Sequence, residues 1–212
     1  MNPAAAKASF IPPTPRIVED IHPDLSCELF AEALSRAFHE HATSINGFAP
    51  PSGLGQIMYI FVTQSLREAL SALPGWHPSD QNNIARMVHS SSGVSIICSG
   101  GDENTGREAA MPSTRSAKGA GTTQLAGQLS MFDHGVPEAC GRIWYFLYYV
   151  DLLKREIRCE LSHPSRIESG SAINFWSHRV LLPAIPLEAA FVAVDFEATE
   201  EINIPIEIKK AV

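Results

Sequence analysis

The fold is decided by residues 141–183, GRIWYFLYYVDLLKREIRCELSHPSRIESGSAINFWSHRVLLP, in which aromatic and β-branched residues form runs of strand length. The first run, 143–150, is apolar at nearly every position, which predicts a strand buried between two layers. The next run, 156–161, alternates apolar and charged residues, which predicts a half-exposed strand with Glu160 facing solvent. The stretch therefore predicts a sheet, and it carries no catalytic signature.

Helices are predicted ahead of this sheet. Asp24 can cap a helix that ends before Asn46, and apolar residues recur at helical spacing over about 56–73. Ser79 is a plausible cap for a shorter third helix through Val88. A strand over 94–98 follows a serine-rich turn.

The later part of the chain reads as a run of strands. Beyond the two strands in the opening stretch, further strands are expected near 172–182, 189–196 and 202–208. No amphipathic pattern of helical length separates them, so a doubly wound fold is disfavoured. The sequence predicts an α+β protein in which N-terminal helices pack on a largely antiparallel, C-terminal β-sheet.

The domain organisation follows from shifts in composition, and the four parts are expected to form one composite domain. They are a proline-rich arm (1–23), a helical part with one strand (24–98), a polar Gly/Ser/Thr-rich loop or linker (99–130) and a β-rich part (131–212).

Composition narrows the class of protein. The chain has 212 residues, 45% hydrophobic and 18% charged, with a net charge of −7. The acidic balance disfavours nucleic acid as a partner, because such binding depends on clustered Lys and Arg. No secretory signal and no membrane span is apparent, and the four cysteines show no paired spacing, so a soluble, cytoplasmic protein with reduced thiols is expected.

The polar loop holds one candidate site. Asp102 and Glu103 could bind Mg²⁺ or Mn²⁺, while Arg115 and Lys118 could neutralise a phosphate. The alternative, a solvated loop without a site, stays open because the glycine-rich composition cannot fill a core. The loop lacks the Gly-Lys-Ser/Thr order of a phosphate-binding P-loop.

Aromatic residues on the predicted sheet form a second candidate. Trp144, Tyr148 and Trp176, with Arg179 beside them, could bind a partner or a ligand, or could simply belong to the core. Nucleobase stacking on such a face is the less favoured alternative. The serines form no hydrolase elbow motif and the histidines show no zinc-ligand spacing, so no catalytic residue is assigned.

Residues 94–208 resemble uncharacterised proteins of bacteria and their mobile elements. The resemblance rests on short motifs, namely Ser99-Gly100-Gly101-Asp102-Glu103 with Thr105-Gly106, Lys118-Gly119, Trp144, the run 156–162 with Pro164, and Trp176 ahead of 179–183. It implies an association with phage or defence systems and supplies no catalytic residue.

Two functions of different classes are compatible with these observations. The favoured one is a non-catalytic binding or assembly protein without a cofactor, such as an accessory subunit of a mobile-element or antiphage system, with a protein partner or a homo-oligomeric state. The alternative is a metal-dependent phosphoesterase or nuclease that uses the 99–118 loop. Whether the protein is an enzyme is left open by the sequence.

Overall fold

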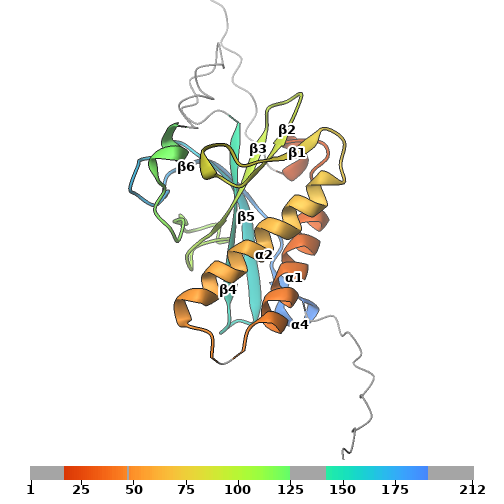
Figure 1. Ribbon diagram of the computed structural model, residues 1–212, viewed down its shortest axis with the longest axis vertical. Coiled ribbons are helices and arrows are strands. Elements are labelled where there is room, and N and C mark those ends of the chain that lie inside the picture. Colours follow the sequence, from red (N-terminus) through yellow and green to blue (C-terminus); the bar gives the residue numbers. More distant parts are fainter. Residues whose placement is uncertain (1–16, 47, 125–141, 191–212) are drawn as a thin grey trace, which may run out of the picture.

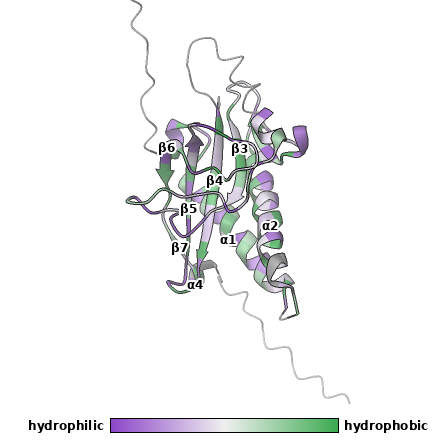
Figure 2. Cartoon of the chain, turned by 90° about the vertical axis from the view of Figure 1, so that its left-hand side faces the viewer, coloured by the Kyte–Doolittle hydropathy of each residue, from purple (hydrophilic) through white to green (hydrophobic). Residues whose placement is uncertain are grey.

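A computed structural model gives the fold and describes residues 17–46, 48–124 and 142–190. Two long helices lie on one side of a mixed sheet, and segments without long helices lie on the other side (Figures 1 and 2). Helices come first along the chain and most strands follow. The predicted α+β class, with a mostly antiparallel sheet, is confirmed.

The first long helix is α1 (Cys27–Ser44), and it begins two residues later than Asp24 would place it. Ser26 is the cap, since its Oγ accepts a hydrogen bond from the Leu29 amide at 3.2 Å. The expected cap, Asp24, instead accepts a hydrogen bond from Trp76 Nε1 at 3.2 Å. The buried residues of α1 recur at helical spacing along one face, and they are Phe30, Ala33, Leu34, Ala37 and Phe38.

The second long helix, α2 (Pro51–Ser71), starts before the expected Gln56. Proline is tolerated in the first helical turn because the N–H that it lacks would have no partner there. Buried Met58, Val62 and Leu66 recur along one face and join the same core as α1. The helix pair therefore presents a continuous apolar surface to the sheet.

A β-hairpin replaces the predicted third helix. Strands β1 (Trp76–Ser79) and β2 (Arg86–His89) pair in antiparallel fashion across a turn that contains the 3-10 turn η2 (Gln81–Asn83). Asn82 and Asn83 both have positive φ, at 58° and 59°. Asparagine tolerates this left-handed region, so the Asn-Asn pair favours a chain reversal over a helix.

The sheet has the strand order β1-β2-β3-β4-β5-β6, with the short β7 (Ile185–Pro186) paired to the other end of β5. β3 (Ser95–Gly100) and β4 (Ile143–Asp151) are parallel, and the remaining pairs are antiparallel. β5 (Glu156–Pro164) and β6 (Trp176–Leu181) complete the sheet. The one parallel pair requires a long crossover, which the polar segment after β3 begins.

The end of the described chain differs from expectation. β6 is shorter than the predicted strand 172–182, and the chain turns helical in α4 (Leu187–Ala190), where a strand from residue 189 was expected. The rest of that predicted strand and the one at 202–208 lie outside the described residues. The short 3-10 turn η1 (Val18–Asp20) precedes α1 and buries Val18 in the main core.

The sheet separates two buried clusters. On the helix-covered face, alternate strand residues such as Ile96, Phe146 and Leu161 join α1 and α2 in the main core. On the opposite face a smaller cluster contains Ile97, Ile143, Tyr145, Leu147, Ile173 and Trp176. Successive strand residues point to opposite faces, so β4 supplies both clusters.

The prediction that the 156–161 strand is half-exposed was wrong. Every residue of β5 after Glu156 is buried, and Glu160 is 0% exposed. The cause is the polar segment after β3, which lies on the second face: the Gly106 amide donates a 2.8 Å hydrogen bond to the Glu160 carboxylate. A loop that composition marks as unable to fill a core thus covers part of the sheet.

Two remaining expectations concern thiols and membranes. Cys27, Cys98 and Cys159 are unpaired thiols, and the last two are buried. No helix in the described part of the chain combines the length and apolar character that crossing a bilayer requires.

Candidate functional site

A cavity forms where β3 runs beyond its neighbour β2. The pairing with β2 ends at Ile97, while the pairing with β4 continues to Gly100. The returning chain then approaches this edge, since the Arg115 amide donates a 2.8 Å hydrogen bond to the Gly100 carbonyl. The space between this edge and the N-terminal half of α2 is left open.

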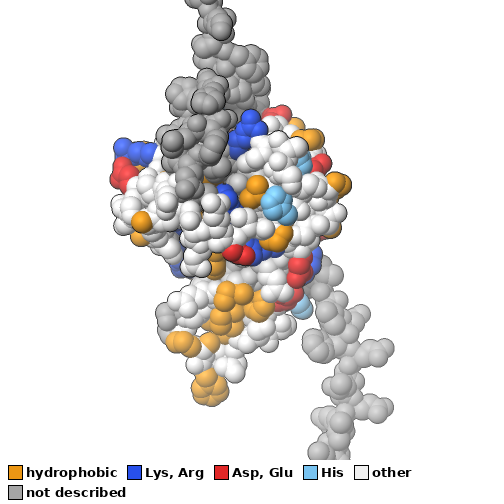
Figure 3. All heavy atoms as spheres, turned by 45° about the horizontal axis from the view of Figure 1, so that its top comes forward, with side chains coloured by type: hydrophobic (Ala, Val, Ile, Leu, Met, Phe, Trp, Pro, Cys, Tyr) orange, Lys and Arg blue, Asp and Glu red, His pale blue; other side chains and the backbone are white. Residues whose placement is uncertain are grey.

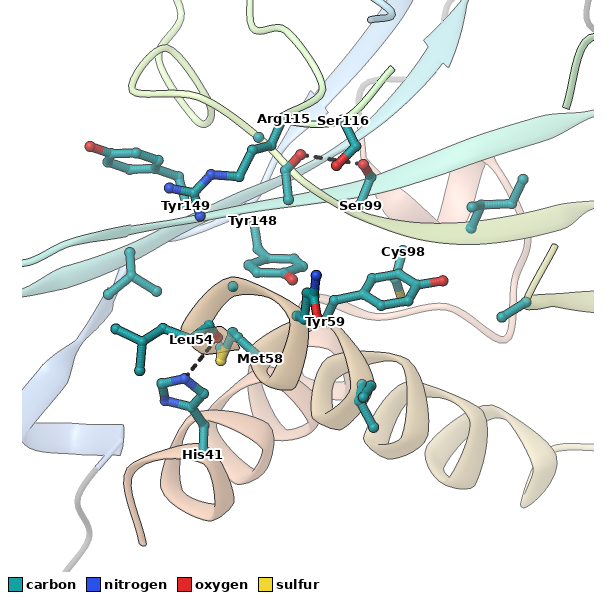
Figure 4. Close-up of a pocket in the computed structure, with 18 of the residues that line it drawn as sticks. His41, Leu54, Met58, Tyr59, Cys98, Ser99, Arg115, Ser116, Tyr148 and Tyr149 are labelled. Atoms are coloured by element: carbon teal, nitrogen blue, oxygen red, sulfur yellow. Dashed lines mark hydrogen bonds between the residues drawn. The ribbon is translucent and has the colours of Figure 1, made fainter. Parts of the chain in front are cut away.

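The cavity has a volume of about 1270 Å³ and two chemically different sides. Figure 4 shows Ser99, Arg115 and Ser116 on one side of the strands, and Met58 and His41 on the side of the helices. The lining is mainly apolar and aromatic, and it includes Tyr59, Tyr145, Tyr148 and Tyr149.

The charge of the cavity is opposite to that of the whole chain. Arg115 and Lys118 line it, and none of its described lining residues is an Asp or a Glu. The whole chain carries a net charge of −7. A cavity with cations and no described carboxylate in an acidic protein favours an anionic ligand over a cationic one.

A hydrogen bond between two side chains of the cavity joins Lys118 and Ser99. Lys118 Nζ donates a 2.9 Å hydrogen bond to Ser99 Oγ and lies 5.6 Å from the centre of the Tyr145 ring. Burial lowers the pKa of Lys118 from 10.5 to about 8. Among the described residues no carboxylate forms an ion pair with this lysine, so none of their negative charges offsets the cost of burying its ammonium group.

Backbone hydrogen bonds fix the position of Lys118. Its amide donates to the Ser171 carbonyl at 2.9 Å, and its carbonyl accepts from the Gly170 amide at 2.8 Å. Nearby, Thr114 and Ile173 exchange two further hydrogen bonds. The segment 114–118 is therefore joined to the 170–173 segment, and the Lys118 side chain is held over the second face of the sheet.

Arg115 spans the opening between sheet and helix. Its aliphatic carbons lie within 3.8 Å of the position that a Cβ on Gly100 would occupy. Its Nη1 lies 3.4 Å from the corresponding position on Gly55 of α2. The guanidinium group thus reaches α2 while the backbone of Arg115 is bonded to β3, and Arg115 forms no ion pair with any described residue.

The helix side of the cavity is apolar, with few polar side-chain groups. Tyr148 is 6% exposed, and burial raises the pKa of its hydroxyl above the ordinary value. His41 contacts the Leu54 carbonyl at 3.1 Å, which joins the end of α1 to the start of α2. This side suits the hydrocarbon or aromatic part of a ligand.

The four loop residues singled out in the sequence separate into two pairs. Arg115 and Lys118 line the cavity, whereas Asp102 and Glu103 do not. Asp102 Oδ1 accepts a hydrogen bond from the Asn104 amide at 3.0 Å, and Glu103 is exposed. No group of residues able to hold a metal was found around them in the described part of the chain.

The aromatic candidates are mostly buried by the protein itself. Trp144 is 7% exposed and packs on His163 with the ring centres 5.3 Å apart. Trp176 is 6% exposed, and its Nε1 donates a 2.8 Å hydrogen bond to the Pro112 carbonyl. Of the three aromatic candidates, only Tyr148 lines the cavity, and the role of the two tryptophans at an interface stays a prediction.

Arg179 belongs to a buried ion pair. Its Nε and Nη2 donate to the two carboxylate oxygens of Glu160 at 2.9 and 2.6 Å. The same guanidinium donates to the carbonyls of Ala110 and Arg107 at 2.7 and 3.1 Å. This bidentate pair fastens the covering loop to the sheet.

A further polar cluster lies away from the cavity. His22, Asp24 and His89 offer ligand atoms within 4.8 Å of one another, and they are the one metal-capable group found in the described residues. The His22 and His89 rings are already in contact, with centres 4.0 Å apart, and Trp76 packs on both. Burial and the neighbouring His89 lower the pKa of His22.

The Ser99–Lys118 contact was missed in the sequence. Nineteen positions separate the two residues, and neither stands in a recognised catalytic motif. The available signal was a serine at the end of a predicted strand followed by a lysine in a polar loop, a pattern too common to single out.

Comparison of the chain with protein-family models, with curated proteins and with solved structures finds no match.

Proposed function

We propose that the protein binds a small amphipathic anion, such as a carboxylate on an aromatic or aliphatic body, in the cavity beside β3. The observation that carries the proposal is the pairing of Arg115 and Lys118 with an otherwise neutral, tyrosine-rich lining. The two cations would meet the negative group, and the α2 side of the cavity would receive the apolar body. The sequence favours a binding or assembly protein with a protein partner, and a small ligand in the cavity is a different kind of binding.

A matched pair of fluorescent probes tests the charge preference. Anilinonaphthalene sulfonate is anionic and amphipathic, and phenylnaphthylamine has the same aromatic skeleton without the sulfonate. We expect the anionic probe to bind at least about 10-fold more tightly, which corresponds to about 1.4 kcal/mol. Arg115→Gln should remove most of that advantage and leave the affinity for the neutral probe unchanged.

Arg166→Gln is the control for this experiment. Arg166 is an exposed arginine that stacks on Phe175 and does not line the cavity. Arg166→Gln removes the same net charge as Arg115→Gln, so it measures how much the overall charge of the protein attracts the anionic probe. Equal affinity for the two probes in the parent protein, or equal losses in the two variants, would refute the proposal.

The expected protein partner or homo-oligomer is a separate matter. The space-filling view shows hydrophobic side chains gathered on the lower lobe, the end where the α1–α2 connection lies (Figure 3). Phe48 is 96% exposed and Ile60 is 56% exposed. Light scattering at several concentrations tests this prediction, and a mass that stays monomeric would contradict self-association.

The metal-dependent alternative stays a prediction without support from a specific contact. Asp102 and Glu103 lie outside the cavity that contains the candidate phosphate ligands Arg115 and Lys118. We therefore do not advance it as a second function.

A further inference from the structure

We propose that Ser99 and Lys118 form a nucleophile and general-base pair that hydrolyses a carboxylic ester bound in the same cavity. The inference rests on the proposed function, because the cavity must first bind the ester. It adds a reaction and two catalytic residues to that binding site.

The geometry meets the first requirement for such a pair. A serine hydroxyl is a weak nucleophile unless a base within hydrogen-bond reach accepts its proton. Lys118 Nζ lies 2.9 Å from Ser99 Oγ, and both residues line the cavity. Serine–lysine pairs are an established variant of the serine–histidine arrangement.

The environment of Lys118 meets the second requirement, a base that is neutral in part near neutral pH. An ammonium group is stabilised by carboxylates and by water, and Lys118 is partly buried with no ion-pair partner among the described residues. Burial alone accounts for its lowered pKa of about 8. A general base works best when its pKa lies near the working pH.

The groups around the pair do not restore a strong preference for the charged lysine. Tyr145 of β4 lies with its ring centre 5.6 Å from Nζ, and Arg115, the other described cation of the cavity, supplies no negative charge. On the segment that bonds to the Lys118 backbone, Glu168 is exposed and pairs with Arg166 at 3.4 Å.

The first half of the reaction transfers the acyl group. Neutral Lys118 accepts the hydroxyl proton of Ser99, and Oγ forms a bond to the ester carbonyl carbon. The bond from that carbon to the alcohol oxygen then breaks, and Lys118 returns the proton to the departing alcohol. An acyl ester of Ser99 and a free alcohol result.

The second half uses water as the acceptor. Lys118 takes a proton from a water molecule whose oxygen attacks the acyl carbon. The bond to Ser99 Oγ breaks, and Lys118 gives the proton back to that oxygen. The product is a carboxylic acid that ionises, and Arg115 in the same cavity offers a positive charge for the resulting carboxylate.

The test measures covalent labelling of the folded, full-length protein by a fluorophosphonate, which transfers its phosphonyl group to an activated serine with loss of fluoride. We expect one label per chain, located on Ser99 by peptide mass spectrometry. The labelling rate should rise with pH with a midpoint near 8, because only neutral Lys118 is a base. Turnover of p-nitrophenyl butyrate should follow the same profile.

Lys118→Arg is the decisive variant, because arginine keeps the positive charge and stays protonated. We expect the labelling rate to drop by about 100-fold or more, the usual contribution of a general base. Arg166→Gln, which lies outside the cavity, should be labelled at the rate of the parent protein. Ser99→Ala should lose the label entirely.

The outcomes separate the two proposals. Unlabelled Ser99 in a protein that binds the anionic probe would overturn the hydrolase inference and leave the binding function intact. Labelling that is equally fast in Lys118→Arg would also overturn it. If the parent protein does not bind anilinonaphthalene sulfonate, the proposed function is overturned instead. A thermal unfolding midpoint close to that of the parent establishes that each variant is folded.

Discussion

The two faces of the sheet are both buried, but they are buried by different chemistry. The helix-covered face is apolar, as Phe146 against Phe30 illustrates, with ring centres 4.9 Å apart. The opposite face buries ionised and polar groups, among them Glu160, Arg158 and Ser99. A polar loop can therefore cover a sheet when its backbone groups form hydrogen bonds with charged strand residues, as the Gly106 amide does with Glu160.

This difference has energetic consequences. On the apolar face, the free energy of unfolding falls in proportion to the number of buried atoms that a substitution removes. A buried ion pair responds to the removal of one partner with a large loss, because the other charge stays buried without compensation. The second face therefore holds charged and polar side chains that are shielded from water. The cavity lies where that face meets the end of β3 that extends beyond β2.

The largest effect is expected on the helix-covered face. Phe146→Ala should lower the free energy of unfolding by about 4 kcal/mol, because a fully buried aromatic ring leaves a cavity in the core. Urea denaturation followed by circular dichroism measures the loss. Leu153→Ala is the matched control, since Leu153 is 98% exposed and should change stability little. Similar losses in both variants would contradict the position of the core.

A smaller loss is expected when the ion pair of the other face is broken. Arg179→Met should cost about 3 kcal/mol, because Glu160 would keep its buried charge without its guanidinium partner. The double variant Arg179→Met with Glu160→Leu should be more stable than Arg179→Met alone. Additive losses in denaturant titrations would show that the two residues do not act as a pair.

Much of the fold was predictable from the sequence because it rests on periodic apolar patterns. The apolar run of β4 places its residues in both buried clusters, and the alternation of β5 places its apolar residues in the main core. The sequence predicts a helix where the hairpin around Asn82 lies, because a short segment shows little apolar periodicity. The two asparagines adopt positive φ there and form a turn instead. Tertiary contacts also buried Glu160, which local alternation placed in solvent.

The candidate site was less predictable. Arg115 and Lys118 were singled out, but as partners of Asp102 and Glu103, which lie elsewhere. The position of Lys118 depends on hydrogen bonds to residues 170–171, and these join segments about 50 positions apart. No local pattern encodes such a contact, so the pairing with Ser99 emerges only from the folded chain.

The smallest effect concerns Lys118, whose charge on the second face has no ion-pair partner among the described residues. Because the pKa of Lys118 is about 8 in the folded chain and 10.5 ordinarily, the unfolded chain binds more protons between these values. Stability therefore increases as pH rises through this window, and below pH 8 the buried ammonium is destabilising. Lys118→Met should accordingly be more stable than the parent at pH 7, by on the order of 2 kcal/mol.

The difference in the free energy of unfolding between Lys118→Met and the parent should shrink as pH rises from 8 toward 10, since the parent then folds with a neutral lysine. Paired urea titrations at pH 7 and 9.5 measure this change, and other groups that titrate in the window cancel in the subtraction. A variant that is less stable than the parent at pH 7 would mean that the Ser99 contact outweighs the cost of burial. In that case Lys118 would serve to hold the covering loop on the sheet, and the second face would resemble the first in being built for stability alone.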